Sequence, residues 1–168
     1  MTKREYVLGF NNVFKSERVV REFLCEKCNT VRFTLIETKQ RGGEKDATFL
    51  ATVDHLRDDF IEKEVDSCRY TIEQGGNILY THYYYWLSMR MKLILSNKTL
   101  LWDVFSQDIP CEFYGFSDPL FCNAHKGFYD IIAITISHEP YINFHLEIKD
   151  KYELDKRLRE NNLEIDWY

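Results

Sequence analysis

The sequence predicts a single α+β domain, in which an antiparallel sheet (a meander plus a C-terminal hairpin) packs with two to four helices. Three observations point to this class. Runs rich in β-branched and aromatic residues alternate with turn signals, and other stretches repeat apolar residues at helical spacing. The 168 residues also contain no linker, internal repeat or low-complexity tract, and a chain of this length forms one domain by default.

The predicted meander lies in the aromatic-rich stretch 68–105, which contains two turn signals, Gly75-Gly76 and Asn97-Lys98. Two glycines suit a tight hairpin turn, because glycine reaches positive φ without steric cost. The β-prone runs that these turns separate are 70–72, 78–80, 92–95 and 100–102. We therefore expect three or four antiparallel strands here.

Residues 77–90 fit two interpretations. Apolar and aromatic residues recur there at helical spacing, which is typical of a buried helix. The run Tyr83-Tyr84-Tyr85-Trp86 favours a strand by propensity. We prefer the strand.

Local signals predict the N-terminal elements. A short strand is expected over 5–10, and Ser16 is placed to cap a helix over 17–27. The residues from Thr30 to Thr38 alternate as a half-buried strand does, and 47–53 suits the next strand.

A second helix is expected after Asp54, with apolar residues from Leu56 to Cys68 on one stripe and a charged, solvated opposite face. The segment 117–129 is interpreted as the longest loop.

A C-terminal hairpin is predicted over 130–149, turning at Pro140. Its apolar pattern sets Ile136 opposite Phe144, which sends Asn143, His145 and Glu147 to the solvated face. Asp150 then begins a short helix with a capping box, and the ending 163–168 is expected to add an edge strand or to dock Trp167.

Composition limits the location and the class of ligand. No apolar run approaches the roughly 20 residues of a membrane span, and the N-terminus lacks a signal-peptide core. Five cysteines without a secretory segment indicate reduced thiols, so we expect a cytoplasmic protein. The net charge of −5 argues against nucleic acid as the main ligand and fits a basic protein partner.

Two cysteine-containing pairs raise the alternative of a structural zinc site, Cys25 with Cys28 and Cys122 with His125. Cys25 falls inside the predicted helix, and no Gly or Pro forms the usual knuckle turn. Small apolar roles in the core explain these cysteines better, so we expect no metal and no cofactor.

Asp130, Glu147 and Lys149 imitate the acidic pattern of restriction-type nucleases, which hold Mg²⁺ between carboxylates. The predicted hairpin register argues against a shared metal, because it turns Asp130 to the face opposite Glu147 and Lys149.

No catalytic motif is evident, since the chain has no serine elbow, P-loop or dinucleotide-binding glycine pattern. His145 with Glu147 is the nearest match to an acid–base pair, because residues two apart on a strand point the same way. An enzyme that uses these residues or the Cys122 and His125 pair, and a zinc-containing domain, are the alternatives that we keep open.

The remaining chemistry lies on the surface, and it favours a small binding protein. Acidic, aromatic and polar side chains form the candidate partner-binding set: Asp58, Asp59, Glu62, Asp66, Tyr114, Phe116, Asn143, His145 and Glu147. An acidic inhibitor that acts by protein–protein interaction has this character, as do bacterial immunity proteins that neutralise a cognate toxin.

Overall fold

A computed structural model describes residues 2–9, 13–38, 53–66, 78–96, 116–135, 141–164 and 166–168. These residues form one antiparallel sheet of eight strands in the order β3-β4-β2-β5-β6-β7-β1-β8. The strands are β1 (Arg4–Gly9), β2 (Thr30–Thr38), β3 (Phe60–Asp66), β4 (Ile78–Trp86), β5 (Phe116–His125), β6 (Phe128–Thr135), β7 (Tyr141–Leu146) and β8 (Asp166–Trp167). The predicted α+β class is confirmed.

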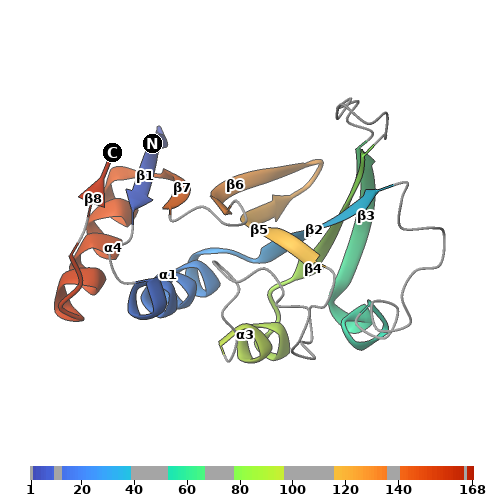
Figure 1. The fold of residues 1–168 in the computed structure, drawn as a ribbon, viewed down its shortest axis with the longest axis horizontal. Helices are drawn as coiled ribbons and strands as arrows, with labels where there is room; N and C mark the ends of the chain where they lie inside the picture. Colours follow the sequence, from blue (N-terminus) through green and yellow to red (C-terminus); the bar gives the residue numbers. More distant parts are fainter. Residues whose placement is uncertain are drawn as a thin grey trace.

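Three fully described α-helices line one face of this sheet (Figure 1), and residues 53–55 are the described part of another helix. The three are α1 (Val13–Lys27), α3 (Met89–Ser96) and α4 (Ile148–Glu160), and a short 3₁₀ helix, η1 (Arg57–Asp59), precedes β3. Helix α1 packs against both α3 and α4. The core therefore lies between this row of helices and the covered face of the sheet.

Cross-strand pairing extends the core across the sheet. One row on the helix-covered face runs through seven strands: Phe60, Tyr85, Val31, Phe121, Ala133, Phe144 and Tyr6. The adjacent row on the opposite face is Glu62, Tyr84, Arg32, Leu120, Ile134, Asn143 and Val7. The first row is almost entirely apolar and the second is mixed, so the alternation of side chains along each strand determines which face packs on the helices.

The predicted apolar stripe of α1 is confirmed, because Val19, Val20, Phe23 and Leu24 are all buried. The predicted N-cap is wrong, since α1 begins at Val13 and Ser16 lies inside the first helical turn.

The two ends of the chain meet in the sheet. Strand β1 lies between β7 and β8, so the predicted edge strand at the C-terminus is present. The Trp167 ring makes edge-on contacts with Tyr6 (5.9 Å) and Phe144 (6.0 Å), and its indole nitrogen donates to Asp155. Residues near both termini therefore complete one part of the core.

Strand β4 confirms the preferred interpretation of 77–90, but its neighbours in the chain were predicted wrongly. Residues 60–66 form a strand rather than part of a helix, because they pair with β4 over nearly their whole length. Residues 92–95 belong to helix α3, and 117–129 belong to β5, β6 and the turn between them rather than to a loop.

The predicted register of the C-terminal hairpin is also wrong. Phe144 stands opposite Ala133 rather than Ile136. Strand β6 ends at Thr135 and β7 begins at Tyr141, so the connection is longer than a tight turn around Pro140. This shift by an odd number of residues exchanges the two faces of β6 relative to β7.

Helix α4 begins one turn earlier than predicted, with Glu147 at its N-cap position and Asp150 in its first turn. The turns at Gly75-Gly76 and Asn97-Lys98, the runs 70–72 and 100–102, and residues 47–52 lie outside the described residues.

Candidate functional site

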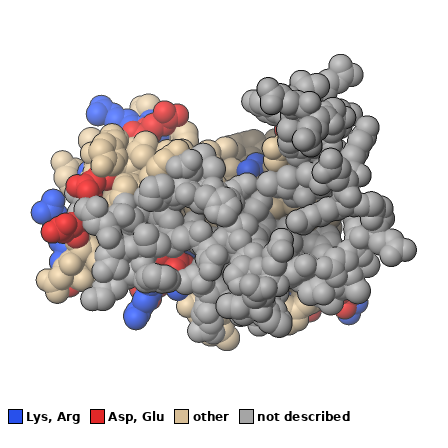
Figure 2. All heavy atoms as spheres, viewed as in Figure 1, with Lys and Arg blue, Asp and Glu red and all other residues tan. Residues whose placement is uncertain are grey.

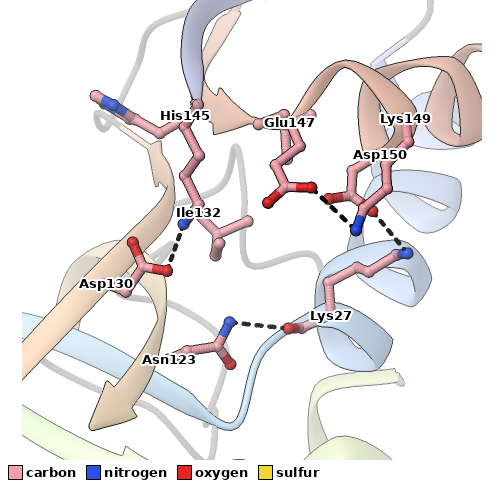
Figure 3. A pocket seen from close by; sticks show the side chains of 10 residues that line it. Lys27, Asn123, Asp130, Ile132, His145, Glu147, Lys149 and Asp150 are labelled. Atoms are coloured by element: carbon pink, nitrogen blue, oxygen red, sulfur yellow. Dashed lines mark hydrogen bonds and ion pairs between the residues drawn. The ribbon is translucent and has the colours of Figure 1, made fainter. Parts of the chain in front are cut away.

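A polar pocket of about 190 Å³ lies where the end of α1 and the start of α4 meet strands β5, β6 and β7 (Figure 3). Its lining contains equal numbers of ammonium and carboxylate groups: Lys3, Lys27, Lys149, Asp130, Glu147 and Asp150.

Each of these charges has an opposite partner. Lys3 Nζ lies 2.5 Å from Asp130 Oδ2, and Lys149 Nζ lies 2.9 Å from Glu147 Oε2. Lys27 Nζ lies 2.9 Å from Asp150 Oδ1 and also donates to Glu153. The pocket thus has no uncompensated charge that would attract an ionic ligand.

The charged residues of this pocket stabilise the two helix ends that form it. Lys27 is the last residue of α1 and Asp150 lies in the first turn of α4, so each charge suits the dipole of its own helix. Hydrogen bonding to Glu153 and Asp150 raises the pKa of Lys27. Asn123 Nδ2 donates to the Lys27 carbonyl oxygen (3.1 Å), which connects the same junction to β5. These contacts join α1, α4 and the sheet.

Asp130, Glu147 and Lys149 line this same pocket, so the predicted separation of their side chains is wrong. The cause is the register of the hairpin, and Glu147 and Lys149 lie beyond the end of β7 rather than on it. The described residues nevertheless contain no group of three or more His, Cys, Asp and Glu side chains arranged to hold a metal ion. Figure 3 also shows the His145 ring pointing away from Glu147, so the two do not form an acid–base pair in this structure.

The cysteines considered for zinc are protonated groups in or near the core. Burial raises the pKa of Cys25 to about 11 and that of Cys122 to about 12, and it raises the pKa of Cys28 as well. Metal binding and nucleophilic attack both need the thiolate, which these values disfavour. His125 is exposed and stacks on Phe128 (ring centroids 5.0 Å apart), and its position three residues after Cys122 on β5 sends it to the other face.

The acidic side chains of β3 differ from those of the pocket. Glu62, Glu64 and Asp66 are exposed and project from one face of the strand, which we call the acidic face of β3. Among the described residues, none of the three forms an ion pair with Lys, Arg or His. Around α4, by contrast, acidic and basic side chains are intermixed (Figure 2), and most of the acids there pair with a neighbour, as Glu26 does with Arg157 (2.5 Å) and Asp155 with Lys151 (3.0 Å).

A tyrosine pair lies beside this acidic face. Tyr84 of β4 and Tyr129 of β6 stack with ring centroids 4.3 Å apart, over the two strands that separate β4 from β6. The Tyr129 hydroxyl donates to Glu62 Oε1 (2.5 Å), and the Tyr84 hydroxyl donates to Glu64 Oε2 (3.3 Å). Burial and Glu62 raise the pKa of Tyr129, so its hydroxyl stays protonated as a donor. These bonds restrain two carboxylates without neutralising their charge.

Arg32 lies on β2 next to the tyrosine pair. It pairs with Tyr84 of β4 on one side and with Leu120 of β5 on the other. Its side chain is half-buried, and its Nε is buried without a hydrogen-bond partner. Burial raises the pKa of Tyr84. The positive charge of Arg32 acts in the opposite direction but has a smaller effect.

The structure divides the predicted partner-binding residues between two regions. Asp58, Glu62 and Asp66 are exposed on η1 and β3, whereas Asp59 is buried and accepts a hydrogen bond from Arg90 (3.0 Å). Asn143 and His145 are half-exposed on β7, and Glu147 lines the polar pocket. Four strands lie between β3 and β7 in the order of the sheet. Phe116 begins β5 opposite Leu35, and Tyr114 lies outside the described residues.

The sequence interpretation missed Glu64, Tyr84 and Tyr129 as neighbours of Glu62. A usable signal existed in the run Glu62-Lys63-Glu64-Val65-Asp66, because acids at every second position indicate one face of a strand. The pairing of Tyr84 with Tyr129 has no such local signal, since it depends on the strand order.

In the part of the chain that the structure describes, no helix has the length and apolar character needed to cross a membrane. Comparisons of the sequence with protein-family models and with curated proteins, and of the structure with solved structures, found no match.

Proposed function

We propose that this protein acts in the cytoplasm by binding another protein through a basic surface of that partner, as an inhibitor of the immunity type does when it covers an active site or exosite. The observation that carries the proposal is the acidic face of β3, where exposed carboxylates have no ion-pair partner among the described residues. An uncompensated group of like charges attracts a surface of opposite charge and accelerates encounter with it.

The surroundings of the acidic face fit a protein ligand better than a small cation. Phe60 and Val65, both on β3, are 40% and 56% exposed on the face opposite the acids, so the same strand also exposes apolar area. A protein interface commonly combines such apolar contacts with a charged rim. The tyrosine hydroxyls that bind Glu62 and Glu64 reduce the freedom of these carboxylates, which lowers the entropic cost of placing them against a partner.

The test is co-purification from native cells, followed by reconstitution with the identified partner. The wild-type protein is compared with the variant Glu62→Gln/Glu64→Gln/Asp66→Asn, which removes three charges and retains the hydrogen-bonding shape. The matched control is Glu5→Gln/Glu160→Gln/Glu164→Gln, which removes three exposed charges elsewhere.

We expect the β3 variant to weaken association about tenfold or more and to reduce its dependence on salt, while the control changes both little. Failure to find a stable protein partner would remove the proposal, and equal binding by both variants would assign the interaction to another surface.

A further inference from the structure

Among the described residues, strand β3 forms one edge of the sheet and pairs with β4 alone. Six of its seven residues are exposed. The opposite edge is the two-residue strand β8, which is too short to accept much pairing. In any edge strand, alternate residues direct their N–H and C=O groups away from the sheet, where they are available to another strand.

We infer that this edge binds an extended segment of the partner as an added strand, and that lysine or arginine side chains of the segment lie beside the acidic face of β3. The inference rests on the proposed function and specifies its mode: main-chain hydrogen bonds supply the pairing, and alternate side chains supply the selectivity.

The charges of β3 define the partner segment. Directly opposite side chains on paired strands lie about 5 Å apart at Cβ, close enough for opposite charges to attract. Glu62, Glu64 and Asp66 share one face, and Lys63 and Val65 share the other. A complementary segment therefore alternates basic residues with small or apolar ones.

The same charges disfavour a second copy of this chain as the occupant. Two copies joined edge to edge across a two-fold axis perpendicular to the sheet keep their faces aligned, so the acidic face of one β3 would continue into the acidic face of the other. Like charges at these positions destabilise the pairing. The acidic residues of β3 therefore disfavour pairing with a second β3 and favour pairing with a strand that has basic side chains.

The experiment uses the full-length protein and a labelled synthetic peptide, slightly longer than β3, in which lysine alternates with threonine. A second peptide has the same sequence but is N-methylated at two adjacent central residues, which removes one donor from each edge of the strand and leaves every lysine charged. A third peptide has glutamate in place of lysine. Binding is measured by fluorescence anisotropy, and amide hydrogen exchange of β3 is measured with and without peptide.

Strand addition predicts that the lysine peptide binds and slows exchange of β3 amides. It predicts that N-methylation weakens binding about tenfold or more, because main-chain bonds and their alignment are lost. The glutamate peptide should not bind, and the Glu62→Gln/Glu64→Gln/Asp66→Asn variant should bind the lysine peptide less tightly than wild type.

Equal binding of the lysine peptide and its N-methylated form would overturn strand addition and leave a purely electrostatic surface, which is compatible with the proposed function. Absence of binding by the lysine peptide would overturn strand addition, whereas the proposed function depends separately on the co-purified partner. Wild-type dimers in analytical ultracentrifugation that disappear when Val65 is replaced by proline would assign the edge to a second copy instead.

Discussion

At the scale of single residues, burial determines the chemistry of the described cysteines. Cys28 and Cys122 are buried and Cys25 is half-buried, and for each the loss of solvation is the largest influence on the thiol pKa. Cationic neighbours such as Lys92 act in the opposite direction on Cys25 but have a smaller effect. Cys28 belongs to the core cluster and Cys25 packs against it, so these two thiols contribute to packing rather than to a reactive site.

Native Cys25 should consequently react slowly with iodoacetamide. With a pKa of about 11, roughly one thiol in a thousand is ionised at pH 8, against roughly one in ten at its ordinary pKa of 9.0. Alkylation at pH 8, located by peptide mass spectrometry, should be about a hundredfold slower in the folded protein than in denaturant. Equal rates would contradict the burial of this thiol.

The raised pKa of Cys25 should also make the free energy of unfolding fall at alkaline pH. Because folding raises the pKa of Cys25, the folded state keeps its proton at pH values where the unfolded state has lost it. The contribution of the protonated Cys25 thiol to the free energy of unfolding is complete below pH 9.0 and is lost as the pH rises through about 11. The free energy of unfolding, measured in urea across this range, should fall less steeply for Cys25→Ala than for the wild type.

At the scale of elements, packing against a neighbour overrides local pattern. Residues 54–66 have apolar residues at a spacing that suits a helix, yet from Phe60 onward they form the outer partner of β4. A helix there would leave that side of β4 without its hydrogen bonds. Helix α3 shows the reverse case, since its Leu93-Ile94-Leu95 run is β-prone but places Met91 and Leu95 in the core as a helix.

Helix α4 provides a direct test of which face contributes to stability. Leu154 is fully buried, whereas Tyr152 is 64% exposed. Leu154→Ala should lower the free energy of unfolding by about 2–5 kcal/mol, because it leaves a cavity between α4 and the sheet. Tyr152→Ala should change it by less than about 0.5 kcal/mol. Urea denaturation of both variants checks the result, and comparable losses would mean that α4 packs in another orientation.

At the scale of the whole molecule, strands from near both ends of the sequence lie side by side at one end of the sheet. Strand β1 needs β7, which follows it by more than a hundred residues, and β8 then adds to its other side. Pairing at such sequence separation is slow to form and depends on the complete chain.

Trp167 should therefore be important for stability despite its place next to the last residue. Trp167→Ala removes the ring contacts with Tyr6 and Phe144 and the hydrogen bond to Asp155, at a cost of about 2–4 kcal/mol. Tyr168→Ala keeps the backbone bonds to Val7 and removes an 80% exposed ring, so it should cost less than about 0.5 kcal/mol. Thermal unfolding of the two variants distinguishes them, and a stable Trp167→Ala protein would show that β8 contributes little.

The sequence by itself predicted the α+β class, strands β1 and β2 and the buried stripe of α1, because these depend on local periodicity and on burial of apolar side chains. It favoured a strand over a helix at β4, and at 163–168 it left an edge strand and the docking of Trp167 as alternatives. Tertiary structure alone decided the hairpin register and the strand conformation of 60–66, since both depend on which distant segment supplies the hydrogen bonds. The same holds for the candidate surface: the sequence indicated Glu62 and Asp66 as acidic partner-binding residues. Their position on the outermost strand of the described sheet, next to the paired rings of Tyr84 and Tyr129, follows from the order of the strands.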